Sequence, residues 1–287
     1  MDIRLAHCGP PKALKKGLSP TSNADLPALL VSFYYLNPFV RQRDKYAFRD
    51  WSMDSGAFSA HNSGKAIDPK EYTETCRHLL ATDPMLTEVF ALDVIGDHRA
   101  SLRNCEKMWE DGIEAIPCFH RGEPWDALLH IAKNYPKIAV GGVVGLHAKK
   151  KMEWVGQCFA RVWPKRIHGF GMGGRDMVLG FPFESVDATN WELGPCAFGR
   201  WNKFGNMSVR GGEQNLRVEV DYYLELERLA RARWRKEMAQ LKAIGPVVRL
   251  AHANGAGGAR LAIASPPHVR LATQAKNRLI PALDKVT

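Results

Sequence analysis

The sequence predicts an α/β fold, a (β/α)8 barrel followed by a basic helical extension. Three observations lead to this prediction. Short apolar runs alternate with longer segments of helical periodicity, which is typical of parallel βα units. No Gly-x-Gly-x-x-Gly turn follows the first run, which disfavours a doubly wound dinucleotide-binding sheet. Polar residues or glycines end nearly every run, and in a barrel all these ends meet at one mouth.

Seven apolar runs have the length of strands, and we expect strands at residues 29–35, 51–54, 89–93, 115–119, 138–144, 167–171 and 183–187. The eighth strand has the weakest pattern, and we place it within residues 196–209. Helices are expected between the strands, at residues 69–81, 100–111, 124–134 and 149–161, with Asp68 as the N-cap of the first. One long helix is expected at residues 218–244.

Length and composition suit one large barrel with an appendage. The chain has 287 residues, of which 45% are hydrophobic and 24% charged. We expect a barrel domain over residues 1–215 and a basic helix with a C-terminal tail, packed on the barrel, over residues 216–287. No apolar run approaches the roughly 18 residues of a membrane span, and none of the six cysteines forms a Cys-x-x-Cys pair. These features predict a cytoplasmic protein with reduced thiols and no membrane contact.

The positive charge is concentrated near the C-terminal end. The net charge is +10, and from residue 226 onward twelve Lys and Arg stand against three Asp and Glu. Such an asymmetry is typical of proteins that bind a polyanion, although a solvated helix that touches nothing gives the same count. We expect Arg231, Arg233 and Arg235 to contact nucleic-acid phosphates beside the barrel mouth. The structural alternative is that these arginines pair with acids such as Glu225 or Glu227.

Three aspartates stand at the ends of expected strands. Asp54, Asp93 and Asp187 each follow a run of apolar residues. A carboxylate in that position lies at the barrel rim, where such folds place their active sites, although each alone could simply cap the following helix or loop. Carboxylates suit chemistry at a glycosidic carbon, since one can attack the sugar while another moves the proton of the base.

Glycines follow the fifth and sixth of these strands. Gly141 and Gly142 end one, and four more glycines lie between residues 169 and 174. Missing side chains let a flat ligand approach the backbone. The same pattern is typical of a phosphate-binding loop, because barrels often bind phosphate beside their last strands. The residues themselves leave both interpretations open.

Four segments resemble the tRNA-guanine transglycosylases. Residues 54–58 (DSGAF) are similar to that family's Asp-Ser-Gly-Gly-aromatic motif, and residues 140–143 (VGGV) to its Gly-Gly-Leu segment. Residues 168–173 (HGFGMG) resemble its Leu-Met-Gly-Val-Gly stretch, and residues 185–189 (SVDAT) stand in the place of its Phe-Asp-Cys-Val motif. The resemblance covers about residues 27–195. It is strongest to the shorter relatives from phages and bacterial islands, the 7-deazaguanine DNA transglycosylases.

The resemblance implies a role for each matching position. Asp187 would be the nucleophile on the sugar C1′, and Asp54 the general acid and base. Phe58 and Phe170 would stack on the two faces of the base. The full set of residues that would bind the base is Asp93, Ser55, Phe58, Gly141, Gly142, Phe170 and His120. For both phenylalanines, ordinary core packing is the alternative.

Two departures from the family pattern matter. The tRNA enzymes carry a late zinc subdomain of three cysteines and a histidine, whereas this chain has no cysteine after Cys196. The family's glutamine after the fourth strand is replaced here by His120. Asp97, His98 and His147 are also expected near the mouth, but their spacing with His120 matches no zinc pattern. We therefore expect neither a metal ion nor another cofactor.

Aromatic and basic residues alternate after Asp187. Arg200, Trp201 and Lys203 have the composition of a groove for a nucleic-acid strand, and the alternative is that the aromatics close the barrel. The resemblance implies an enzyme that replaces guanine in DNA with a free 7-deazaguanine such as preQ0, after the guanine leaves the stack. Three rivals stay open: the same exchange on tRNA, a catalytically silent nucleic-acid-binding barrel, and an unrelated phosphate-binding barrel enzyme. The sequence also leaves open a homodimer or a helper protein that opens the duplex.

Overall fold

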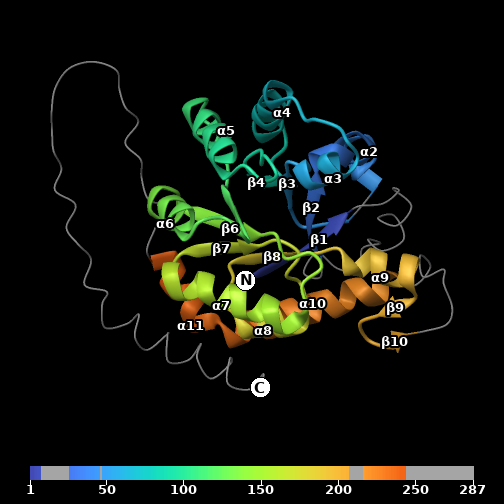
Figure 1. Ribbon diagram of the computed structural model, residues 1–287. Coiled ribbons are helices and arrows are strands. Elements are labelled where there is room, and N and C mark those ends of the chain that lie inside the picture. The colour runs from blue at the N-terminus through green and yellow to red at the C-terminus, as the bar shows by residue number, and fades with distance from the viewer. Residues whose placement is uncertain (8–25, 46, 207–215, 244–287) are drawn as a thin grey trace, which may run out of the picture.

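The computed structural model describes residues 1–7, 26–45, 47–206 and 216–243, and it has eight parallel strands in one curved sheet (Figure 1). The strands are β1 (Asp2–His7), β2 (Ala28–Ser32), β3 (Trp51–Asp54), β4 (Leu86–Val89), β5 (Cys118–His120), β6 (Lys137–Gly141), β7 (Arg166–Gly169) and β8 (Ser185–Ala188). Their order is β4-β3-β2-β1-β8-β7-β6-β5, as in a (β/α)8 barrel. The predicted fold class is therefore confirmed.

The sheet closes between its two edge strands. Just beyond β4, Phe90 forms a parallel bridge with Ile116, which precedes β5. The amide of Ala91 donates to Ile116 O at 2.9 Å, and the amide of Ile116 donates to Val89 O at 2.9 Å. All strands point the same way around this ring, so their carboxyl ends share one mouth.

The eighth strand is β1, at the start of the chain, and not a segment of residues 196–209 as expected. β1 pairs with both β2 and β8. The sequence hides this strand because Arg4 stands in its centre, yet Arg4 is only 4% exposed and faces the barrel interior. Of residues 196–209, the described part instead holds the end of a helix and a short antiparallel hairpin, β9 (Arg200–Trp201) and β10 (Gly205–Asn206).

Most other expected elements are confirmed, with shifted ends. The helices between strands are α4 (Pro69–Thr82), α5 (His98–Glu110), α6 (Trp125–Asn134) and α7 (Ala148–Val162), and Asp68 caps α4 as expected. The strand expected at residues 29–35 stops at Ser32 because a 3-10 turn, η2 (Phe33–Tyr35), follows. Shorter helices missed by the sequence pattern are α2 (Leu36–Val40), α3 (Ala57–Asn62), α8 (Arg175–Gly180) and α9 (Asn190–Phe198).

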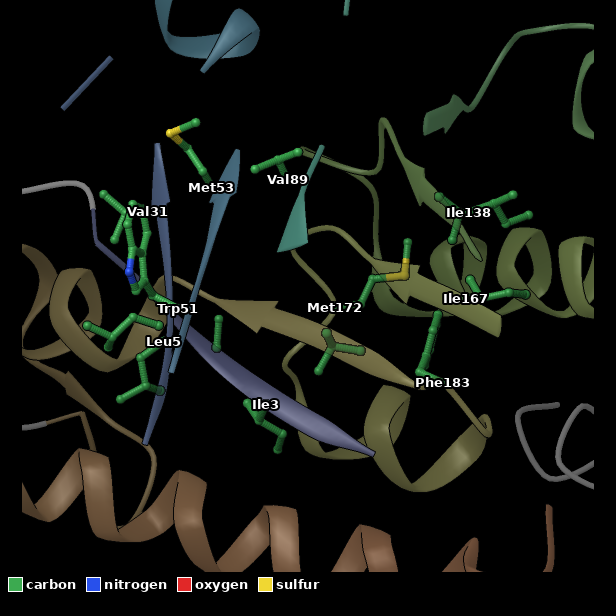
Figure 2. Close-up of a cluster of buried hydrophobic side chains, with 14 of the residues drawn as sticks. Ile3, Leu5, Val31, Trp51, Met53, Val89, Ile138, Ile167, Met172 and Phe183 are labelled. Carbon is green, nitrogen blue, oxygen red and sulfur yellow. The ribbon is translucent and has the colours of Figure 1, made fainter. Parts of the chain in front are cut away.

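Two apolar cores hold the barrel. The larger lies between the strands and the outer helices, and Figure 2 shows part of it, including Ile3, Trp51 and Phe183. The smaller fills the barrel interior with Ala6, Leu30, Phe90, Ile116 and Ala139. Burying a side chain such as Ile3 or Phe183 stabilises the fold by about 1.5–3 kcal/mol. The inner cluster forms an apolar floor beneath the mouth.

Below this floor lies a layer of buried charges. Arg4 Nη1 bonds Asp50 Oδ1 at 2.6 Å, and Lys137 Nζ lies 2.6 Å from Glu88 Oε1 and 3.3 Å from Glu184 Oε2. Lys137 is 5% exposed. Removing one partner of such a buried group leaves an uncompensated charge, which destabilises a fold by about 3–5 kcal/mol. A cavity of about 460 Å³ beside this layer is lined by Glu88, Lys137 and Arg166 among others.

The basic helix is part of the barrel wall. It is split at Trp234 into α10 (Leu216–Arg233) and α11 (Arg235–Ala243), where one helix was expected, and α10 packs against β1, α8 and α9 (Figure 1). Glu227 Oε2 accepts from the amide of Ile3 at 2.7 Å, and Arg231 Nε donates to Met1 O at 2.8 Å. The C-terminal half of α10 therefore lies at the amino ends of the strands, opposite the mouth. Among the described helices, none is long and apolar enough to cross a membrane.

Candidate active site

The structure brings the three aspartates together at the barrel mouth. Asp54 is the last residue of β3, Asp187 lies in β8, and Asp93 follows β4. The charge of Asp187 raises the pKa of Asp54, and the charge of Asp54 raises the pKa of Asp93, so Asp54 lies near both other carboxyls. A cluster of carboxyls at this end of a barrel has the form of an active site.

Asp187 is fixed by the glycine loop after β7. Its Oδ1 accepts from the amide of Gly171 at 2.7 Å, and its backbone carbonyl accepts from the amide of Gly173 at 2.8 Å. A Cβ on Gly173 would lie 2.4 Å from that of Ala188, so this close approach requires glycine. The Gly171 amide therefore holds the carboxylate, and the Gly173 amide holds the backbone of Asp187. Burial raises the pKa of Asp187 to about 7.

Asp54 is fixed by the turn that leads into α3. Its Oδ2 accepts from the amide of Gly56 at 3.1 Å. Gly56 has φ +75°, and a Cβ there would lie 2.4 Å from Ser32 Oγ. Ser55, an expected base-binding residue, is buried and its Oγ accepts from the amide of Ala57 at 3.4 Å. Burial, helped by the charge of Asp187, raises the pKa of Asp54 to about 6.

His168, to which the sequence pattern assigns no role, lies beneath Asp187. Its Nδ1 is 2.9 Å from Ser185 Oγ, and its Nε2 is 3.6 Å from Asp187 Oδ1. Ser185 Oγ in turn accepts from Lys137 Nζ at 3.1 Å. Because Ser185 Oγ accepts from Lys137, its own hydroxyl proton is donated to Nδ1 of His168. The proton of the neutral ring is therefore on Nε2, which faces Asp187. Burial, then the charge of Lys137, lowers the pKa of His168 well below its ordinary value, so the ring is neutral.

A second cluster joins Asp93 to β5. His120 Nε2 lies 3.4 Å from Asp93 Oδ2 and 3.5 Å from Cys118 Sγ. His120 Nδ1 lies 3.3 Å from Glu123 Oε1, and Glu123 Oε2 also accepts from the His120 amide at 3.1 Å. The Cys118 sulfur, the hydrogen bonds to Cys118 and Glu123 and the charge of Asp93 raise the pKa of His120. Burial raises the pKa of Asp93 to about 7.

The glycines after β6 lie beside this second cluster. A Cβ on Gly141 would come within 3.4 Å of His120 Cδ2 and 3.5 Å of Cys118 Sγ. Gly142 has φ +76°, and a Cβ there would lie 2.9 Å from the amide nitrogen of Arg121. Both glycines therefore place bare backbone beside this cluster, where a flat base could approach it.

The two expected stacking rings differ in their surroundings. Phe170 is partly buried, with its ring centre 4.7 Å from those of Phe90 and His168. Phe58 lies on α3 with 53% of its surface exposed, so its ring is free of the core. Asp97 caps α5 through the amides of Arg99 and Ala100, which is the ordinary role of an aspartate there.

The hairpin after α9 forms an exposed aromatic and basic surface. Phe198 and Phe204 are 62% and 55% exposed, and the cations of Arg200 and Lys203 lie over their rings at 5.8 and 5.7 Å. Asn202 anchors the hairpin, because its amide and side chain donate to Glu219 at the start of α10. We call Phe198, Arg200, Lys203 and Phe204 the hairpin surface.

Two nucleic-acid predictions do not fit the structure. Trp201 is only 7% exposed, so its ring packs inward and offers no face to a base. Arg231 pairs with Asp2 at 2.5 Å and Glu227 at 2.7 Å, at the end of the barrel opposite the mouth. Arg233 lies over the Trp234 ring at 5.0 Å, and Arg235 begins α11 beyond it. Glu227 is the structural partner that the sequence left as an alternative.

Four side chains that complete the site were not predicted from the sequence: Cys118, Glu123, His168 and Lys137. Cys118 and His120 are two residues apart on one strand, which places both on the same face, and this spacing was a usable signal. No comparable signal exists in the sequence for His168 and Lys137, because only the closed barrel brings them to Ser185.

Comparisons with known proteins identify no family for this chain. No protein-family model and no curated protein matches the chain. Among solved structures, the chain is similar to a protein from Coccidioides immitis described as a fructose-1,6-biphosphate aldolase, with a TM-score of 0.46 and 10% identity over 85% of this chain and 90% of the other. The architecture of this chain is a (β/α)8 barrel, and its mouth carries the three carboxyl groups.

Proposed function

We propose that this protein is a base-exchange glycosyltransferase that replaces guanine in DNA with a free 7-deazaguanine. One observation carries the proposal: Asp187 is held at the mouth by the Gly171 amide, with the carboxyl of Asp54 close by. The motif resemblance assigns the nucleophile and the proton carrier to these same two positions.

In the first step the Asp187 carboxylate attacks C1′ of the deoxyribose. The C1′–N9 bond breaks, its electron pair goes to N9 of the guanine, and the Asp54 carboxyl donates a proton there. In the second step the incoming base loses its N9 proton to Asp54 and attacks C1′, which releases Asp187. Bonds and protons balance without an external reagent.

The pKa values of the two carboxyls let them share one proton. A pair with pKa values of about 6 and about 7 carries one proton between them near neutral pH. The first step needs that proton on Asp54. Because Asp187 has the higher pKa, the reactive form, with Asp187 ionised and Asp54 protonated, is the less populated of the two singly protonated forms. The Nε2–H of the neutral His168 ring faces Asp187, which is 4% exposed, and its dipole favours the ionised form of that carboxyl.

The hairpin surface supports a nucleic-acid substrate. Exposed rings can stack on bases while the adjacent cations meet phosphates, which is how single strands are held. A guanine must leave its duplex to reach Asp187, which is only 4% exposed at the barrel mouth. DNA is proposed as the substrate because the motif resemblance is strongest to the shorter, DNA-modifying relatives.

Nucleoside mass spectrometry tests the proposal. Cells that express the chain with a supply of preQ0 should contain a 7-deazaguanine nucleoside in their DNA, and cells that express Asp187→Ala should not. A 7-deazaguanine nucleoside found in tRNA but not in DNA would show that the substrate is tRNA. Unmodified DNA and tRNA, with folded protein present, would leave a nucleic-acid-binding barrel as the better description.

A further inference from the structure

Asp93, Cys118 and His120 bring three different metal-binding groups to one point of the mouth. Cys118 and His120 lie on the same face of β5, and Asp93 comes from the end of the neighbouring β4 segment. One ligand atom from each of the three lies within 4.8 Å of the others. Thiolate, imidazole and carboxylate together are the ligand set of a zinc site.

Two of the three separations between these atoms match edges of a coordination tetrahedron, and the third is within 4.8 Å. With bond lengths of about 2.3 Å to sulfur and about 2.0–2.1 Å to nitrogen and oxygen, a tetrahedral ion separates S from N by ~3.6 Å and N from O by ~3.3 Å. The observed separations are 3.5 and 3.4 Å. A charge-assisted hydrogen bond between His120 and Asp93 would be shorter, at about 2.7–2.9 Å.

His120 is oriented as metal-binding histidines are. Its Nδ1 faces Glu123 Oε1 at 3.3 Å, while the second carboxylate oxygen of Glu123 holds the His120 backbone amide. A carboxylate on one ring nitrogen fixes the tautomer and leaves the lone pair of the other for the ion. Here that other nitrogen is Nε2, which is the atom that faces Asp93 and Cys118.

The cluster also contains a buried polar atom with no partner. The Asp93 side chain is 11% exposed, and its Oδ1 accepts no hydrogen bond. A buried carboxylate oxygen without a donor is costly unless a ligand occupies it. Gly141 keeps the adjoining wall free of side-chain atoms, since a Cβ there would touch both His120 and Cys118.

We propose that Asp93, Cys118 and His120 bind one divalent transition-metal ion, for which Zn²⁺ is the best match. Three protein ligands leave a fourth position, as in zinc sites that polarise a bound oxygen. A resident Zn²⁺ would supply a Lewis acid next to Asp54 and the base-binding wall. The site uses two residues that the resemblance assigns to base binding, Asp93 and His120, and leaves Asp187 free; it departs from the metal-free protein that the sequence predicts.

Cobalt titration of the full-length chain tests the site directly. Protein stripped with a chelator should bind Co²⁺ at about one ion per chain, with the near-ultraviolet charge-transfer band of a cobalt–thiolate bond. Cys118→Ser should lose the band, and His120→Gln should weaken Zn²⁺ binding at least tenfold. Cys196→Ser, which changes a half-buried thiol in α9, should leave both unchanged.

Binding of Co²⁺ without the sulfur band, or equal Zn²⁺ affinity in wild type and His120→Gln, would overturn the site. Circular dichroism of each variant separates loss of a ligand from loss of the fold. Because the readout is coordination and not turnover, the result is independent of nucleoside analysis. A metal-free protein that modifies DNA would refute this site alone, and a zinc protein that modifies nothing would refute the proposed exchange alone.

Discussion

The imidazole of His168 lies 3.6 Å from the carboxylate of Asp187, measured between Nε2 and Oδ1, and both side chains are almost fully buried. This contact ends a chain that begins with Glu88 and Lys137 in the charged layer and passes through Ser185. The charged layer therefore sets the tautomer of His168, and His168 in turn presents an N–H to the proposed nucleophile.

His168→Leu should reduce exchange by less than about tenfold, because Nε2 faces Asp187 at 3.6 Å, too far for the hydrogen bond to a charged group that contributes about 1.5–3 kcal/mol. His168→Gln, which retains an N–H, should recover part of the rate. We expect the change in kcat and in the pH profile, with KM nearly constant, because His168 does not touch the substrate. A pH profile unchanged in both variants would show that His168 only fills space.

Asp187→Asn should abolish exchange and stabilise the fold at high pH. Burial raises the pKa of Asp187 to about 7. The pKa of Asp187 is higher in the folded protein than in the unfolded chain. The contribution of Asp187 to the free energy of unfolding is therefore fully present below about pH 4 and is lost as the pH rises through about 7. The difference in unfolding free energy between variant and wild type should thus grow over that range, by on the order of 4 kcal/mol at most. Denaturant titrations at pH 4 and pH 8 measure it.

The pH dependence of kcat/KM should be bell-shaped. Asp54 and Asp187, with pKa values of about 6 and about 7, must hold one proton between them. The rate should peak between these values and fall about tenfold per pH unit beyond each limb. Asp54→Asn should remove most turnover. A rate that stays flat from pH 5 to pH 9 would contradict the paired roles.

Gly173→Ala should lose both stability and activity, whereas Gly174→Ala should lose neither. A Cβ on Gly173 would lie 2.4 Å from that of Ala188, but one on Gly174 would meet no atom within 4 Å. Forcing an extra carbon into such a contact costs about 1–3 kcal/mol, and here it also moves the amides that hold Asp187. Thermal melts with exchange assays compare this matched pair.

Arg200→Ala and Lys203→Ala should weaken DNA binding and flatten its salt dependence, by about 0.7–0.9 in log–log slope for each phosphate that the variant no longer neutralises. Arg228→Ala is the matched control, because Arg228 is exposed on α10 and pairs with Glu225. Arg231→Ala should lower the melting temperature instead, since its partners are Met1, Asp2 and Glu227. A salt slope that changes with Arg231 and not with Arg200 would move the binding surface to the opposite end of the barrel.

Local pattern alone determined the alternation of strands and helices and the positions of the three carboxyls. The length and spacing of apolar runs indicate strands directly from the sequence. Because parallel strands in a barrel must end at one mouth, the shared location of Asp54, Asp93 and Asp187 was predictable. The Asp68 cap of α4 was predictable for the same local reason.

Only the tertiary structure decided which polar residues face inward and what they meet there. Arg4 made β1 look unlike a strand because its partners, Asp50 and Glu88, are brought to it by other strands. The pairing of Arg231 with Asp2, the burial of Trp201, and the meeting of Asp93 with Cys118 and His120 depend likewise on barrel closure. Side-chain type shows what a residue can bond, whereas its environment depends on strands that are distant in sequence.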